Sequence, residues 1–165
     1  MKVAIIQKEG LRALGYKIAA EYQMDTSKNA AYWVNVDFSA YPAYPAGLVD
    51  KAEIATWYHP EDSQEPLAYY FGTVTDYEGV PEGFVEFKIP AAEFAVFTAS
   101  ETADTDAKEV TAKKVADTWA AIYAEWLPAN PEYKTDPTKM YYELYTGGKA
   151  EIYIPIKKYE NVLFS

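Results

Sequence analysis

The sequence predicts an α+β fold, in which an antiparallel sheet carries two main helices. The first observation behind this prediction is that one order of elements, strand–helix–strand–strand, occurs twice along the 165 residues. The second is that no linker or low-complexity segment separates the two halves, about 1–78 and 79–165. Two such units are expected to form a single domain, 1–165, with pseudo-twofold character and a cleft where the halves meet.

The first half is predicted to hold four strands and one short helix. Its strands are short apolar or alternating runs between turn residues, at 2–7, 11–22, 52–58 and 67–76. A helix is expected over 27–38, with Thr26 or Ser27 as its cap. The proline-rich segment 41–47 prevents regular structure directly after this helix.

The second half contains the clearest helix pattern of the chain, over 106–127. Asp106 and Glu109 have the spacing of a capping box at its start, and Pro128 is expected to stop it. One apolar stripe runs along this helix and consists of Val115, Trp119, Ile122, Tyr123 and Trp126.

Strand patterns flank this helix on both sides. The stretch 83–100 is expected to form a strand that breaks or bends near Pro90. The stretch 139–158 is expected to form a hairpin that turns at Gly147 and Gly148. The second half therefore has the same element order as the first.

The composition excludes several classes of function. A net charge of −10 with a single arginine, Arg12, argues against nucleic acid, although the acidity can equally serve solubility. The absence of cysteine excludes disulfides and zinc–thiolate sites, and the single histidine, His59, fits a turn better than a metal site. No metal and no cofactor are therefore expected. The apolar runs are too short for a signal peptide or a membrane span, which predicts a cytoplasmic protein without a membrane partner.

Glu143 is the strongest candidate for a functional residue, because it stands in a strand of tyrosines. Tyr141 and Tyr145 alternate with it and share its face of the strand. A carboxylate among aromatic rings suits a flat, apolar ligand with a positive charge, since aromatic faces attract cations. The competing interpretation is a half-exposed glutamate on the solvent face of the sheet. Burial would cost the charged form several kcal/mol unless a cation or a hydrogen-bond donor compensates.

Sixteen tyrosines are more than a core of this size needs, and a lined cleft would account for the excess. The further candidates for ligand binding are Trp119, Tyr123, Tyr70, Trp33 and Tyr153. Helical aromatic residues are more often core than cleft. For Tyr153 two alternatives stay open. A two-residue turn pairs Glu143 with Ile152 and puts Tyr153 on the opposite face, whereas an odd-length loop or a bulge would bring it to the side of Glu143.

Four motifs follow one another in fixed order between 69 and 157. They are Tyr69-Tyr70-Phe71-Gly72 with Val80-Pro81-Glu82-Gly83, Ile89-Pro90-Ala91 with Phe94-Ala95-Val96-Phe97, Trp119 with Ile122-Tyr123 and Trp126-Leu127-Pro128, and Tyr142-Glu143-Leu144-Tyr145 with Glu151-Ile152-Tyr153-Ile154-Pro155-Ile156. In this order and spacing they resemble the GyrI-like effector-binding family. That fold occurs alone or as the C-terminal ligand-binding half of AraC-type and MerR-type multidrug-responsive regulators.

The resemblance implies a duplicated strand–helix–strand–strand fold with an aromatic pocket between the halves. It also implies a buried glutamate in the penultimate strand, which faces the pocket in members that bind lipophilic cations, and Glu143 occupies that motif position. Some stand-alone relatives hydrolyse strained cyclopropane-containing toxins. Because the strand patterns start at the first residues, no DNA-binding helix-turn-helix is expected, and the chain looks like a stand-alone member.

Three functions follow from these features. The preferred one is a binding protein for amphipathic or aromatic compounds, preferably cationic, that senses or sequesters a drug or toxin. The second is a hydrolase of strained electrophilic small molecules, with Glu143 as the candidate catalytic general base and a tyrosine as proton donor. The third is an inhibitory interaction module whose acidic surface meets a protein partner such as gyrase. The first two use the same residues, so the sequence does not separate them.

Overall fold

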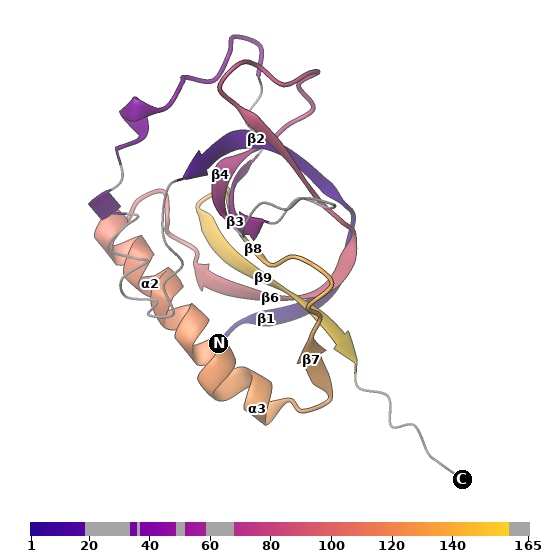
Figure 1. Ribbon diagram of the computed structural model, residues 1–165. Coiled ribbons are helices and arrows are strands. Elements are labelled where there is room, and N and C mark those ends of the chain that lie inside the picture. The colour runs from indigo at the N-terminus through magenta and orange to yellow at the C-terminus, as the bar shows by residue number, and fades with distance from the viewer. Residues whose placement is uncertain (19–33, 36, 49–51, 59–67, 159–165) are drawn as a thin grey trace.

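The computed structural model describes residues 1–18, 34–35, 37–48, 52–58 and 68–158. Within these ranges the chain forms one sheet of nine strands and one main helix, α2 (Lys108–Ala121), which confirms the α+β class. The strands are β1 (Val3–Lys8), β2 (Leu11–Ile18), β3 (Ala52–Tyr58), β4 (Ala68–Val74), β5 (Val85–Ile89), β6 (Ala92–Ser100), β7 (Tyr133–Thr135), β8 (Tyr142–Thr146) and β9 (Lys149–Lys158). Figure 1 shows that the strands curl into an open, barrel-like sheet and that α2 lies against its outer side.

The order of the strands displays an internal duplication. Neighbouring strands are antiparallel in the order β1-β6-β9-β8-β3-β4-β2-β5, and β7 pairs separately with β9. β3 and β8 pair at the centre. β4 and β2 follow beyond β3, and β9 and β6 follow beyond β8. The first strand of each half then pairs with the opposite half, β1 with β6 and β5 with β2. The predicted duplication is therefore confirmed for the strands, with the halves joined at the centre and at both ends of the sheet, whereas only one of the two predicted main helices lies within the described residues.

Apolar cores on both faces of the sheet explain why strands such as β6 have nearly continuous apolar sequences. In β6, Phe94 and Val96 point into the inside of the curled sheet, where the residues of the opposite strands form one core. Ala95 and Phe97 point outward and join a second core beneath α2, together with Val115 of the helix. Strands that are covered on both faces need apolar residues at every position, not only at alternate ones.

The helix begins and ends differently from the prediction. Its N-cap is Ala107, with no side-chain capping bond, because the Asp106 carboxylate instead accepts hydrogen bonds from Thr102 Oγ1 (2.7 Å) and Lys114 Nζ (2.8 Å). The expected capping box is therefore wrong. The helical path also continues through a π-helical turn (Ile122–Trp126) into α3 (Leu127–Ala129). Pro128 lies inside α3, and the helix ends one residue later, at Ala129.

The predicted strands are confirmed within the described residues, and β5 and β6 separate at Pro90 as expected. The hairpin of β8 and β9 turns at Gly147 and Gly148, both of which have positive φ. The short strand β7 was missed by the prediction. Most of the predicted helix over 27–38 lies outside the described residues, and Phe38 begins a 3₁₀ turn, Phe38–Ala40, at its end.

A cavity between the central strands and the helix

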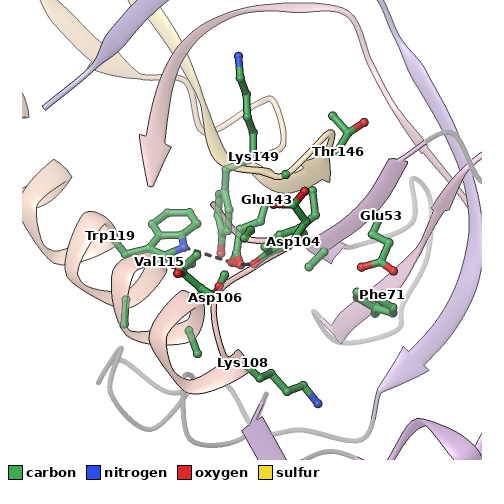
Figure 2. Close-up of a pocket in the computed structure, with 18 of the residues that line it drawn as sticks. Glu53, Phe71, Asp104, Asp106, Lys108, Val115, Trp119, Glu143, Thr146 and Lys149 are labelled. Atoms are coloured by element: carbon green, nitrogen blue, oxygen red, sulfur yellow. Dashed lines mark hydrogen bonds between the residues drawn. The ribbon is translucent and has the colours of Figure 1, made fainter. Parts of the chain in front are cut away.

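A cavity of about 1020 Å³ lies where the two halves of the sheet meet. Its helix wall comes from α2, and the loop 103–106 and the turn 146–148 contribute further lining. Its sheet wall comes from side chains on one face of the central strands, namely Glu53, Ala55, Trp57, Tyr69, Phe71, Tyr141, Glu143 and Tyr145. These residues share a face because side chains alternate along β3, β4 and β8 and because Ala55 pairs with Glu143 and Glu53 with Tyr145. Figure 2 shows this cavity between helix and sheet.

Glu143 is buried in the wall of this cavity, with 8% of its surface exposed. Its carboxylate accepts two hydrogen bonds, one from Trp119 Nε1 on α2 (3.2 Å) and one from Tyr145 Oη on its own strand (2.8 Å). A dashed line in Figure 2 marks the bond between Trp119 and Glu143. The two donors hold the carboxylate in place and satisfy part of its hydrogen-bonding capacity, which reduces the cost of burying it.

The surroundings of Glu143 change its acidity. Burial raises the pKa of Glu143 above its ordinary value of 4.5, and the hydrogen bonds from Tyr145 and Trp119 act in the opposite direction. Burial, followed by the charge of Glu143, raises the pKa of Tyr145 well above 10.0. Tyr145 therefore stays protonated at neutral pH, and its hydroxyl remains a donor to the carboxylate.

Aromatic rings surround this carboxylate on several sides. Trp119 stacks with Tyr123 along the helix, with a centroid distance of 6.3 Å and an interplanar angle of 8°, and meets Tyr141 edge-on at 5.4 Å. On the sheet, Trp57 and Tyr69 form an edge-on pair with centroids 4.7 Å apart. Rings presented both by their faces and by their edges give a large apolar contact area and attract positive charge to the faces.

The charges of the lining are unbalanced. Among the residues that the structure describes, four acidic side chains line the cavity, against two basic ones. The acidic residues are Glu53, Asp104, Asp106 and Glu143, and the basic residues are Lys108 and Lys149. One acid, Asp106, is compensated by Lys114 outside the lining, and Lys108 Nζ lies 6.0 Å from the centroid of the Phe38 ring. Acidic side chains therefore outnumber basic ones in the described part of the lining.

The structure brings five of the predicted binding residues to this cavity. They are Glu143, Tyr141, Tyr145, Trp119 and Tyr123, the last of which is 52% exposed. Tyr70 and Tyr153 lie on the other face of the sheet, in the core inside the curl, so they do not line the cavity. Trp33 lies outside the described residues.

The position of Tyr153 follows from the hairpin register, which the sequence had left open. A two-residue turn pairs Thr146 with Lys149, and Glu143 then lies opposite Ile152 and Tyr142 opposite Tyr153. Tyr153 stacks on Tyr142 with centroids 4.6 Å apart and an interplanar angle of 12°. Glu143 and Tyr153 therefore point to opposite faces of the sheet.

Several lining residues were not among the predicted ones, and on the sheet they include Glu53, Tyr69 and Phe71. Their signal in the sequence was alternation, since Glu53 is two residues before Ala55, and Tyr69 and Phe71 flank the predicted Tyr70. Among the described residues no group of three or more His, Asp or Glu side chains could hold a metal ion. In the same part of the chain, no helix has the length and apolarity that crossing a membrane requires.

The site has the features of a small-molecule pocket, with extensive aromatic surface and a few placed polar groups. The family comparison agrees with this class: residues 4–156 match the Cass2 family of integron-associated effector binding proteins, and the chain belongs to that family. No curated protein sequence is significantly similar to the chain. The GyrI-like resemblance is confirmed by this match together with the fold of the solved structures below.

Several solved structures share the fold at low sequence identity. An integron cassette protein from the mobile metagenome of Vibrio cholerae is 16% identical, with a TM-score of 0.56, over 94% of this chain and 95% of that one. SAV2435, solved bound to tetraphenylphosphonium, is 16% identical with a TM-score of 0.59, over 95% of this chain and 94% of that one. The C-terminal domain of EcmrR is 13% identical with a TM-score of 0.55, over 96% of this chain and 98% of that one.

Proposed function

We propose that this protein binds amphipathic aromatic cations in the cavity between α2 and the central strands, and so senses or sequesters a drug or toxin. The observation that carries the proposal is the buried carboxylate of Glu143 among aromatic rings. Family membership supports binding of a small-molecule effector, and the tetraphenylphosphonium bound to SAV2435 is an aromatic cation held by a protein of the same fold.

The preference for cations follows from the energetic state of Glu143 without ligand. A buried carboxylate loses hydration, and the raised pKa of Glu143 expresses that loss. Trp119 and Tyr145 each donate one hydrogen bond, but neither carries a positive charge to compensate the carboxylate. A bound cation would supply that charge in a site of reduced dielectric, where the attraction is stronger than in water.

Aromatic contacts would add affinity and select for flat or ring-bearing ligands. A desolvated cation–aromatic contact contributes on the order of 1–2 kcal/mol. Several such contacts together with apolar burial reach the roughly −8 kcal/mol of a micromolar complex. The cavity volume of about 1020 Å³ has room for a ligand with several rings.

The test uses tetraphenylphosphonium and the neutral triphenylphosphine oxide as probes in thermal unfolding. At about a hundred times the dissociation constant, a ligand stabilises the folded protein by about 2.7 kcal/mol, which is readily measured as a rise in Tm. We expect the cation to raise the Tm of the wild type, the neutral probe to do so much less, and Glu143→Gln to remove the difference. Glu132→Gln removes an exposed charge outside the cavity lining and serves as the matched control. Equal shifts for both probes would overturn the proposal.

A hydrolase is the second candidate, because Glu143 combines a raised pKa with a neighbouring hydroxyl donor. As general base, Glu143 would take a proton from a water that attacks the strained ring, and Tyr145 would protonate the atom released when the ring bond breaks. The two hydrogen bonds that Glu143 already accepts stabilise its charged form and weaken it as a base, which favours the binding function. Product formation from a cyclopropane-containing electrophile, lost in Glu143→Gln, would support the hydrolase instead.

A further inference from the structure

The hydroxyl of Thr111 is a buried polar group in the lining of the cavity that lacks a hydrogen-bond partner. Thr111 belongs to the part of α2 that forms the helix wall. Its Oγ1 is shielded from solvent and makes no hydrogen bond in the described structure. Buried hydroxyls in folded proteins nearly always have a partner, because leaving one unpaired costs free energy. An exception in the wall of a binding cavity is explained if a ligand completes the pair.

A second threonine of the same helix shows the hydrogen bond that Thr111 lacks. Thr118 Oγ1 donates to the carbonyl oxygen of Lys114, four residues earlier, at 2.7 Å. The corresponding carbonyl for Thr111 is that of Ala107, which accepts the backbone N–H of Thr111 at 3.1 Å but not its hydroxyl. Thr118 is not part of the cavity lining, whereas Thr111 is. The threonine that lines the cavity therefore keeps its hydroxyl available to a ligand.

Short side chains line the helix wall between this hydroxyl and the Glu143 end of the cavity. Thr111 and Trp119 are eight residues apart, which is about two turns, or about 12 Å, of α-helix. Trp119 marks the Glu143 end, since its indole donates to that carboxylate. The lining residues of α2 between them are apolar and short, namely Ala112, Val115 and Ala116. They leave the wall open for one elongated ligand that reaches both ends.

The chemistry at the Thr111 end favours a hydrogen-bond acceptor on the ligand. Lys108 also lines the cavity and precedes Thr111 by three residues, so the two side chains are neighbours on the helix. Figure 2 shows Lys108 away from Trp119 along this helix. An ammonium group only donates hydrogen bonds, and a threonine hydroxyl can donate as well. A neutral oxygen acceptor, such as a carbonyl, suits both groups, whereas the charge of Lys108 disfavours a cationic centre here.

We infer that Thr111 is a specificity residue that donates a hydrogen bond to a neutral oxygen acceptor of the ligand, at the end away from its cationic centre. This inference rests on the proposed function, in which Glu143 holds the cationic centre. The hydroxyl of Thr111 is already out of water without a ligand, so binding does not have to dehydrate it. One neutral hydrogen bond then contributes about fivefold in affinity.

The experiment compares two cations that differ in one group, 4-(4-acetylphenyl)-1-methylpyridinium and its isopropenyl analogue, in which a methylene group replaces the carbonyl oxygen. Both are also prepared with a second phenylene ring, because the side chains at the two ends of the cavity alter the spacing that the helix sets. In calorimetric titration of the wild type, the acetyl probe of at least one length should bind about fivefold more tightly than its analogue. Thr111→Val should bring this ratio close to one, and Thr111→Ser should keep it. Thr118→Val is the matched control and should keep the ratio, since it removes a hydroxyl of the same helix outside the lining.

The outcomes separate this inference from the proposed function. If the wild type binds acetyl and isopropenyl probes equally at both lengths, or if Thr111→Val leaves the ratio unchanged, the role of Thr111 is overturned. Binding of the isopropenyl cation that is lost in Glu143→Gln would still keep the proposed function. If neither these probes nor tetraphenylphosphonium binds, the proposed function and the inference both fall.

Two further results would also overturn the role of Thr111. An equal loss of the ratio in Thr118→Val would assign the preference to the helix as a whole. A clear fall in the Tm of ligand-free Thr111→Val would show that the hydroxyl already has a partner in the folded protein, because removing an unpaired buried hydroxyl should keep or raise the stability.

Discussion

The indole N–H of Trp119 on α2 donates a 3.2 Å hydrogen bond to the carboxylate of Glu143 on β8. Trp119 belongs to the helix wall of the cavity and Glu143 to its sheet wall, so this hydrogen bond connects α2 to the central strands. The same carboxylate is held from its own strand by Tyr145. The orientation of Glu143 is therefore fixed before any ligand arrives, and the reorganisation that binding requires is small.

Replacing Glu143 by Gln should stabilise the ligand-free protein at neutral pH. The folded state raises the pKa of Glu143 above 4.5, so it binds the proton more tightly than the unfolded chain does. The contribution of Glu143 to the free energy of unfolding is thus largest below pH 4.5 and falls as the pH rises through the raised pKa. Each unit of the pKa shift corresponds to about 1.4 kcal/mol. We expect the Tm of Glu143→Gln minus that of the wild type to increase with pH over this range, and a constant difference would contradict the expectation.

Replacing Trp119 by Phe should destabilise the charged form of Glu143 while the cavity wall stays aromatic. A hydrogen bond to a charged group is worth about 1.5–3 kcal/mol, so chemical denaturation at neutral pH should show a loss of about that size. The loss should shrink in acid, where Glu143 is protonated. Trp126→Phe is the matched control on the same helical segment, since Trp126 packs on Phe97 and Tyr133 outside the cavity. Equal pH dependence in both variants would refute the role of the indole N–H.

Replacing Tyr145 by Phe removes the second hydrogen-bond donor to Glu143. A double-mutant cycle with Glu143→Gln measures the coupling energy between the two residues. Because the pKa of Tyr145 is raised well above 10.0, its hydroxyl donates throughout the neutral range. We expect Tyr145→Phe to weaken cation binding and lower the free energy of unfolding in the wild type, but to have a much smaller effect in Glu143→Gln. A coupling energy near zero between the two positions would mean that the 2.8 Å contact does not carry the effect.

Replacing Tyr142 by Phe should leave binding unchanged and keep or raise the stability. Tyr142 is 1% exposed in the core inside the curl, and its hydroxyl has no hydrogen-bond partner in the described structure. An unpaired buried hydroxyl costs about 1–3 kcal/mol, so its removal recovers part of that cost. The ring contacts to Phe94 and Tyr153 remain in the variant. Thermal unfolding with and without tetraphenylphosphonium measures both effects, and a clear fall in Tm would show that the hydroxyl has a partner after all.

Local patterns in the sequence predicted the part of the site that one hairpin builds. Alternation placed Tyr141, Glu143 and Tyr145 on one face, and the Gly147-Gly148 turn confirms that face by setting the register. The same pattern fails at β4, where the sequence predicts Tyr70 but Tyr69 and Phe71 line the cavity. Alternation divides a strand into two faces, but the face that meets the cavity depends on pairing with β3, which in turn pairs with the distant β8.

Competition between partners explains the other differences from the sequence prediction. Asp106 has capping spacing, yet its carboxylate accepts hydrogen bonds from Thr102 and Lys114. Lys114 is eight residues away, which is beyond the reach of a local capping motif. Glu53 was missed for a related reason. Its place in the site depends on the pairing of β3 with β8, and no short motif records contacts between residues some 90 positions apart.

The exchange of first strands between the halves makes the chain resemble a swapped dimer that has been fused into one polypeptide. β1 completes the sheet of the second half and β5 that of the first, so each half carries a strand that only the other can pair. A cut in the exposed turn at Gly79 would leave two fragments, each with an unpaired sheet edge and a strand that fits the other's edge. Each fragment would offer the edge that pairs with the free strand of the other, and the ligand cavity would form only when the two fragments associate.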